Sequence, residues 1–397
     1  MIVSLTGVAH GGYAVGRHDG KVYFVSGGIP GETVEVEITR ESKRFSFARV
    51  LDVRDASPDR VAHVWPEAEE FGVGGADLGH VEIGAQRRWK GHVISDALER
   101  IGGGAVLEEV RGAVGTIQVQ AFSDGTGGTR TRASFVVDDE RRLAMRRAGT
   151  HETVAVSQMP LALQEIDALN LFSGAWSGQL EPGGTVKAVL PSDGVPVLHT
   201  DDGVWLAPAV PAPSFVAESV LCAAGEYHFR LDAGGFWQTH VEAPATLLDA
   251  VIEGASLRGN ERVLELYAGA GLFTLPLAQR AGYVTAIEGT RRAHEDAREN
   301  VRTRNVTLRK SSVTPRALEG EWDVVVLDPP REGAGLTVTR ALAGSGARRI
   351  VYVACDPVAM ARDLAALIGD YAVESFAALD LFEHTHHVEC VAVLARR

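Results

Sequence analysis

The sequence has 397 residues, of which 45% are hydrophobic and 23% charged, so it is long enough for two or three domains. It contains no run of about 18 uncharged apolar residues and no secretion signal at the N-terminus, so we expect a cytoplasmic protein without a membrane span. Its three scattered cysteines exclude a disulfide framework, and its net charge of -13 weighs against a polyanion partner unless local patterns indicate one.

Residues 1 to 56 predict a small antiparallel β-barrel. KVYFVSGGIPGETVEVEI and FSFARVLDV alternate apolar and polar positions between glycine turns, which is typical of short, half-buried strands. Basic residues gather between Arg40 and Arg49, but such a cluster alone is more typical of a solvated edge than of a nucleic-acid contact. The dipeptide at residues 57 and 58, Ser-Pro, marks the expected end of this domain.

Residues 57 to 235 are expected to form a central α+β domain. Residues 80 to 101 predict a helix that stops at three glycines, with the alternative that this helix packs on the C-terminal domain. Residues 131 to 149 predict a hairpin within the most basic stretch of the chain, which indicates a local surface for nucleic acid. The basic residues of this stretch are Arg130, Arg132, Arg141, Arg142, Arg146 and Arg147. Residues 183 to 215 predict loops between short strands.

From about residue 245 the pattern changes to alternating strands and helices. The apolar runs ERVLELY, YVTAIE, DVVVLD and RIVYVAC are separated by helical stretches, which predicts a mostly parallel sheet covered on both faces. We therefore expect an α/β protein of several domains, with a Rossmann-like domain over residues 236 to 397. Its ligand should lie at the carboxyl ends of the strands.

Three of these strand ends predict a cofactor site. Gly269 and Gly271 let the backbone turn sharply against a ligand after the first strand, and Glu288 ends the next strand, where a carboxylate can hold ribose hydroxyls. Asp328 and two prolines end the third strand and form a rigid edge that suits a methyl donor better than a pyrophosphate. Thr274 stands where a dinucleotide fingerprint needs its third glycine, so S-adenosylmethionine is favoured over a nicotinamide cofactor.

A fourth strand end carries a thiol. Cys355 follows the run RIVYVA, and a thiolate there can attack carbon 6 of a pyrimidine, which makes carbon 5 nucleophilic enough to accept a methyl group. A strand-end cysteine is more often a small buried hydrophobe, but the Asp-Pro-Pro strand before it favours the catalytic interpretation.

The same reaction requires a base, because carbon 5 still carries its proton after methyl transfer. Glu389 opens the last strand and is the expected base, with the preceding histidines of HTHHVE as support. These histidines lack the spacing of a helical zinc site, so no metal is expected. Cys390 should point to the opposite face of its strand and lie in the core.

These patterns together resemble those of the RNA uridine-5-methyltransferases, which act on transfer or ribosomal RNA, and the resemblance covers nearly the whole chain. AHGGYAVGRHDGKVYFVSGGIPGE resembles the TRAM domain, an OB-like RNA-binding barrel, and TRTRASFVVDDERRLAMRRAGTHETV resembles the central RNA-contacting domain. The remaining matches, in order, are FWQ, ELYAGAG, AIEGTRRAHEDARENV, DPPREGAG, VYVACDP and HTHHVE.

The resemblance implies a role for six residues. Those that bind S-adenosylmethionine are Gln238, Tyr267, Glu288 and Asp328. Cys355 is the nucleophile, and Glu389 is the base. Physical reasoning alone would treat Gln238 as an ordinary turn residue.

The sequence departs from the family in the iron-sulfur cluster that many members hold with four cysteines. Val73 and Ala76 stand at two of the cysteine positions, Met159 replaces a third, and residues 65 to 70 contain no cysteine for the fourth. We therefore expect no iron-sulfur cluster. RNA remains the expected partner, and the sequence indicates no obligate protein partner.

Ala354 and Asp356 flank the nucleophile where the family usually has Ser and Asn, and the added carboxylate should raise the pKa of the thiol. One rival interpretation is a cytosine-5 RNA methyltransferase, but those enzymes commonly have a cysteine where this chain has Arg331. Another is a non-catalytic RNA-binding protein on the same scaffold, which would form no covalent adduct with RNA. The sequence does not identify the RNA or the uridine.

Overall fold

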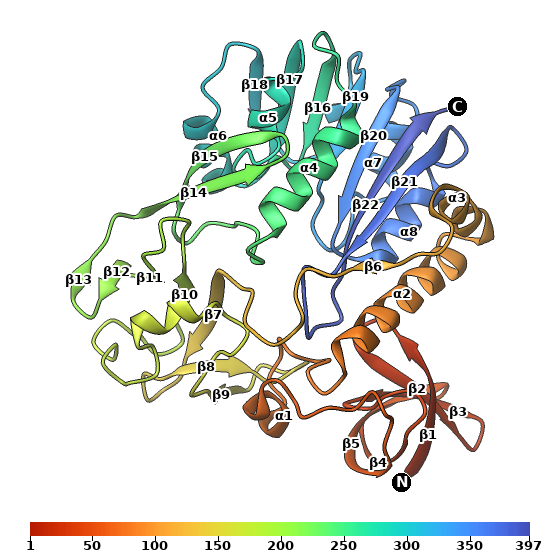
Figure 1. The fold of residues 1–397 in the computed structure, drawn as a ribbon, viewed down its shortest axis with the longest axis vertical. Helices are drawn as coiled ribbons and strands as arrows, with labels where there is room; N and C mark the ends of the chain where they lie inside the picture. The colour runs from red at the N-terminus through yellow and green to blue at the C-terminus, as the bar shows by residue number, and fades with distance from the viewer.

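The N-terminal domain in a computed structural model of all 397 residues is a closed five-stranded barrel (Figure 1). Its strands follow the order β1-β2-β3-β5-β4, and only β3 and β5 pair in parallel. The strands are β1 (Ile2–Ala9), β2 (Tyr13–His18), β3 (Lys21–Ser26), β4 (Thr33–Glu41) and β5 (Phe45–Asp55). Alternate positions bury small aliphatic side chains such as Val3, Ala14 and Val25, so the predicted barrel is confirmed.

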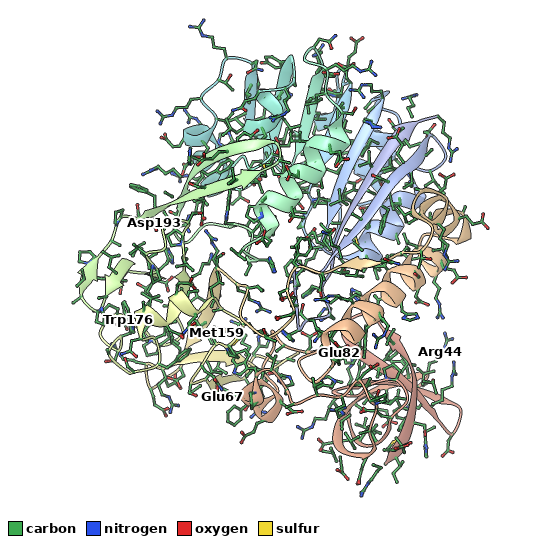
Figure 2. The ribbon with its side chains drawn as sticks, in the orientation of Figure 1. Arg44, Glu67, Glu82, Met159, Trp176 and Asp193 are labelled. Carbon is green, nitrogen blue, oxygen red and sulfur yellow. The ribbon has the colours of Figure 1, made fainter.

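Helix α2 (Ile83–Arg100) joins the barrel to the C-terminal domain. Glu82 caps its N-terminus by accepting bonds from the N–H groups of Gly84 and Ala85, both at 2.8 Å (Figure 2). The first half of α2 packs on the barrel core, whereas its second half packs on the core of the C-terminal domain. The helix expected over residues 80 to 101 is therefore present, and it contacts both domains.

The central domain is a seven-stranded sheet with the order β13-β12-β11-β10-β7-β8-β9. Strands β7 and β8 form the hairpin expected over residues 131 to 149, and residues 183 to 215 contain four short strands. The elements of this region are α1 (Pro66–Phe71), β7 (Arg132–Val137), β8 (Leu143–Arg146), β9 (Thr153–Ala155), η1 (Gln164–Leu169), β10 (Thr185–Val189), β11 (Val197–Thr200), β12 (Gly203–Ala207) and β13 (Val210–Pro211).

The C-terminal domain is a doubly covered sheet of eight strands in the order β18-β17-β16-β19-β20-β22-β21-β6. The first five run in parallel, and β22 is antiparallel to both of its neighbours. The strands are β6 (Val119–Gln120), β16 (Arg262–Leu266), β17 (Tyr283–Glu288), β18 (Val306–Lys310), β19 (Val324–Leu327), β20 (Arg349–Ala354), β21 (Tyr371–Leu379) and β22 (Glu389–Arg396). The remaining elements are α4 (Ala243–Ala255), α5 (Thr274–Ala278), α6 (Arg291–Asn300), η2 (Pro315–Leu318), α7 (Leu336–Ala343) and α8 (Pro357–Ala365).

Two segments from outside residues 236 to 397 complete this domain. Helices α2 and α3 (Gly104–Val114) pack on α8 and β21, and β6 pairs with β21 at the edge of the sheet. The hairpin of β14 (Phe215–Cys222) and β15 (Gly225–Asp232) packs on the other face, beside α4 and α6. These segments bury their apolar faces on the parallel sheet. None of the helices combines the length and apolar character needed to cross a membrane.

Candidate active site

A tight backbone turn follows β16 at the carboxyl edge of the sheet. Tyr267, Gly269 and Gly271 all have positive φ, at 63°, 57° and 94°. A Cβ atom at Gly271 would lie 3.0 Å from Cγ2 of Val301, whereas one at Gly269 would meet no atom within 4 Å. Gly271 is therefore required for packing, and the backbone at Gly269 faces open space in which a ligand can approach it.

Glu288 is fixed across this turn. The Gly269 N–H donates to Glu288 Oε2 at 2.9 Å, and the Thr290 N–H donates to Oε1 at 2.5 Å. A carboxylate oxygen accepts more than one hydrogen bond, so both oxygens retain acceptor capacity for the hydroxyls of a ribose.

A buried acid that the sequence analysis did not single out lies beneath the turn. Glu265 is 1% exposed, and neither of its carboxylate oxygens has a hydrogen-bond partner. Burial raises its pKa to about 8; Thr274 opposes the rise, and the nearby Asp328 and Glu288 add to it. Burial likewise raises the pKa of Asp328, at the end of β19, to about 7. The signal for Glu265 was visible in the sequence as the one charge inside the apolar run VLELY.

The three acids at this edge fit S-adenosylmethionine, which carries a ribose and two positively charged groups, a sulfonium and an ammonium. A nearby cation stabilises ionised carboxylates and offsets their burial. Glu265 and Asp328 are suited to the positive groups, and Glu288 to the ribose.

Gln238 lies in the loop that follows β15, half-buried between the buried side chains of Trp237 and His240. The carbonyl of the next residue, Thr239, accepts bonds from the N–H and Oγ1 of Thr131, at 2.8 and 3.1 Å. This loop is therefore fastened to the central domain at its junction with the catalytic domain. The role of Gln238 in cofactor binding stays a prediction, as do those of Tyr267 and the two glycines.

The register of β20 and β22 places the two expected reacting residues side by side. Ala354 pairs with Cys390 in this antiparallel ladder, so Cys355, one residue beyond β20, lies next to Glu389, the first residue of β22. Cys390 is completely buried, as expected for a residue on the opposite face. The thiol and the carboxyl group thus meet at the edge where the cofactor turn lies.

Carboxyl groups dominate the electrostatics around the thiol. Burial raises the pKa of Cys355 to about 12, Glu389, Asp328 and the adjacent Asp356 add to the rise, and Arg331 opposes it. The pKa of Glu389 is also well above its usual value, because the residue is buried and lies near Asp328. The expected effect of Asp356 on the thiol is present, but it is smaller than those of burial and Glu389. Burial and the neighbouring carboxyl groups thus disfavour the ionised forms of both Cys355 and Glu389 in the free protein.

The histidines before Glu389 fasten its loop to distant segments. Nδ1 of His386 lies 2.6 Å from Asp77 Oδ2, and Gln86 of α2 accepts a bond from the N–H of His384 at 2.8 Å. Burial lowers the pKa of His387 to about 3, so its ring is neutral. These contacts agree with a supporting role for the histidines.

The basic stretch near the central hairpin offers less free charge than its sequence suggests. Arg132 is nearly buried in an ion pair with Glu218 at 2.6 Å, and Arg130 is half-buried and donates to the carbonyl of Gly75 at 2.8 Å. Three further arginines form ion pairs with acids: Arg141 with Glu181, Arg142 with Asp138 and Glu140, and Arg147 with Glu152. Arg130 and the exposed Arg146 have no ion-pair partner, and the other four arginines do, so the predicted basic surface is largely neutralised within the protein.

Apolar side chains occupy the positions where relatives were expected to carry cluster cysteines. Val73 and Ala76 are buried in the core of the central domain, and Met159 packs against that core (Figure 2). Trp65, at the start of the segment that lacks the fourth cysteine, is fully buried in the same core. Close packing of these side chains thus stabilises this region.

Comparison with known proteins agrees with this arrangement. Residues 211–312 and 318–397 match the family model described as tRNA (Uracil-5-)-methyltransferase, and residues 1–51 match the TRAM domain. An uncharacterized RNA methyltransferase of Streptomyces avermitilis is 36% identical, over 99% of this chain and 97% of its own. The 23S rRNA (uracil(1939)-C(5))-methyltransferase of Salmonella typhi is 31% identical, over 97% of this chain and 94% of its own.

A solved structure shares the fold over the whole chain. The tRNA (uracil-54, C5)-methyltransferase of Pyrococcus abyssi, in complex with S-adenosyl-L-homocysteine, is 21% identical with a TM-score of 0.71, and the match covers 99% of both chains. The relatives at 30% identity or more assign the family, and the barrel and the parallel sheet agree with it. The chain belongs to the family of RNA uracil-5-methyltransferases that carry an N-terminal TRAM domain.

Proposed function

We propose that the protein methylates carbon 5 of a uridine in structured RNA through a covalent bond between Cys355 Sγ and carbon 6 of the ring. The observation that carries this proposal is the strand register that sets Cys355 beside Glu389 at the cofactor edge. A nucleophile and a base within reach of one ring are what this reaction requires.

The reaction begins when the Cys355 thiol releases its proton to water and the thiolate bonds to carbon 6, which moves the electron pair of the C5–C6 double bond onto carbon 5 and the neighbouring carbonyl. S-adenosylmethionine, when bound, supplies the methyl group that carbon 5 takes. Glu389 then removes the proton from carbon 5. The released electron pair restores the double bond, the bond between carbon 6 and sulfur breaks, and Cys355 is a thiolate again.

The residues proposed to hold the cofactor are Gln238, Tyr267, Glu288 and Asp328, with the backbone at Gly269 and Gly271. We add Glu265, because a buried carboxylate without partners is unfavourable unless a donor or a cation completes it. Together these residues would bind the ribose and the positive groups and hold the methyl group near Cys355.

The barrel offers a surface suited to unpaired nucleotides. On its outer face Phe24 and Phe47 lie together between Tyr13 and Phe45, with centroids of neighbouring rings 5.1 to 6.5 Å apart, and the Arg40 guanidinium lies 4.2 Å from the centre of the Phe47 ring. Aromatic rings beside cations stack on bases of any sequence. This surface supports RNA as the partner better than the neutralised arginines of the central hairpin do.

Uridine is favoured over cytosine because Arg331 follows the Asp-Pro-Pro segment where cytosine-5 enzymes commonly have a cysteine. Ribosomal or transfer RNA is the proposed substrate, and 23S rRNA is the first to test because relatives named for it are 30 and 31% identical. We place the reaction in the cytoplasm, where these RNAs are found, and propose no obligate protein partner.

RNA containing 5-fluorouridine tests the proposal, because fluorine at carbon 5 cannot leave as a proton and the adduct is trapped. Wild-type protein with S-adenosylmethionine should give a complex that survives denaturation. A protein that binds the cofactor and RNA but forms no adduct is a non-catalytic scaffold. Mass spectrometry of RNA from cells with and without the gene should then locate the 5-methyluridine.

A further inference from the structure

The turn between β1 and β2 reaches from the barrel into the catalytic domain. His10 Nε2 lies 2.9 Å from Oδ2 of Asp356, a residue 346 positions away. The His10 ring also meets the edge of the His386 ring, with centroids 6.0 Å apart. Gly12 has φ 77°, and a Cβ atom there would lie 2.8 Å from Oδ2 of Asp77. The turn thus packs closely against the segments of the catalytic domain around Asp356 and His386 and against the segment around Asp77.

Asp356 is held by three hydrogen bonds. Its Oδ1 accepts from the N–H groups of Val358 and Ala359, at 2.9 and 2.8 Å, which caps α8, and its Oδ2 faces His10. An ionised carboxylate only accepts, so the nitrogen of His10 must be the donor. Burial raises the pKa of Asp356, but the bonds to His10 and to the backbone outweigh it and lower the pKa overall. Asp356 is therefore an ionised group directly after the nucleophile.

The surroundings of Cys355 are rich in carboxyl groups, so a further negative charge there would disfavour its thiolate. Cys355 is faced by Glu389 from β22, by Asp328 and Arg331 from the segment after β19, and by Asp356 from the start of α8. Arg331 is the only cation in this set. Any donor that offsets one of the carboxylates favours the thiolate, because the thiolate competes with their negative charge.

We propose that His10 is a positioning residue of the methyl-transfer reaction, which donates to Asp356 and so fixes the start of α8 and offsets the carboxylate beside the nucleophile. The inference rests on the proposed role of Cys355. It also gives the barrel a second role, because besides any contact with RNA the barrel supplies a side chain on which the reactivity of the thiol depends. His10 and Asp356 thus form one functional pair across two domains.

The test is the rate of adduct formation with 5-fluorouridine RNA in single turnover, measured over a pH series. His10→Ala should slow the reaction at neutral pH by about tenfold, which corresponds to about one pKa unit of the thiol, and move its rise to higher pH. Asp356→Asn keeps a side-chain oxygen for the cap but lacks the charge. Adding His10→Ala to Asp356→Asn should therefore leave unchanged the pH at which the rate of adduct formation rises. His18→Ala, which removes an exposed barrel histidine paired with Asp19 at 3.5 Å, is the control and should behave as wild type.

Three results separate the possibilities. If His10→Ala reacts with the wild-type pH profile, the inference is overturned. If His10→Ala slows the reaction equally in the wild-type and Asp356→Asn backgrounds, His10 only holds the barrel against the catalytic domain, and the inference is again overturned. If wild-type protein forms no adduct, the proposed role of Cys355 fails first. His10→Gln, which retains a donor, should recover part of the rate and checks that the alanine variant has not misfolded.

Discussion

The proposed cofactor side and the proposed nucleophile side of the active site are built in different ways. The cofactor side depends on a local turn after β16 and on acids, among them Glu265, whose carboxylate has no partner. The nucleophile side is held by segments far away in the chain: His10 contacts Asp356, and Gln86 and Lys90 of α2 bind the loop that precedes Glu389. The first side thus contains a buried carboxyl group that lacks a hydrogen-bond partner, whereas the second is held by hydrogen bonds to other segments of the protein.

The strongest test of the nucleophile side is Cys355→Ala. It should abolish turnover and the trapped adduct while leaving cofactor affinity unchanged, because the thiol bonds to RNA and the cofactor contacts lie on the other strands. Denaturing electrophoresis and calorimetry check the two statements. Cys222→Ala, at a half-buried cysteine far from this edge in the sequence, is the matched control and should form the adduct normally.

Glu389→Gln should separate bond formation from release. The amide keeps the shape of the side chain but cannot take the proton from carbon 5, so the methylated covalent intermediate should accumulate on ordinary uridine RNA. Mass spectrometry of the protein–RNA complex measures it. Normal turnover by this variant would show that another group is the base.

Lys90→Met should show how far the nucleophile side depends on α2. The ammonium of Lys90 is fully buried and donates to Asp380 at 2.5 Å and to the carbonyl of Phe382 at 3.0 Å. Asp380 would keep Arg87, 3.1 Å away, as its remaining cation, so we expect the free energy of unfolding to fall by about 3 kcal/mol, the lower end for a buried ion pair broken from one side; denaturant titration measures it. Arg88→Met, at an exposed pair with Asp59 on the same helix, should cost less than about 1 kcal/mol.

Glu265→Gln should show whether the buried carboxyl group of Glu265 lowers the stability of the free protein and helps to bind the cofactor. The pKa of Glu265 is about 8 in the folded protein and 4.5 is its ordinary value, so the folded state binds the extra proton between these two pH values. Stability therefore falls as pH rises through this window, and the loss at pH 7 is about 3 kcal/mol. The variant should remove this pH dependence, unfold at higher temperature near pH 7, and bind S-adenosylmethionine more weakly. Equal pH dependence in both proteins would contradict the assignment.

The sequence predicted those parts of the molecule that depend on local patterns. Alternation along the strands indicated the barrel, and the apolar runs indicated the parallel sheet with Cys355 at its edge. The pairing of β6 with β21 and the contact of His10 with Asp356 could not be predicted, because each joins residues far apart and leaves no local signal. Arg132 misled for the same reason, because its partner Glu218 lies in a hairpin of another domain, whereas the partners of Arg142 and Arg147 stand near them in the sequence.

The position of β6 and its two preceding helices has a consequence for synthesis of the chain. Helices α2 and α3 leave the ribosome before α8 and β21, the elements they cover, have been translated. The first half of α2 can pack on the barrel at once, but the apolar faces of its second half and of α3 stay exposed to solvent for most of the remaining translation. We expect the nascent chain to need chaperones over this interval, and truncated C-terminal products to aggregate, since the catalytic domain closes only when its last strands arrive.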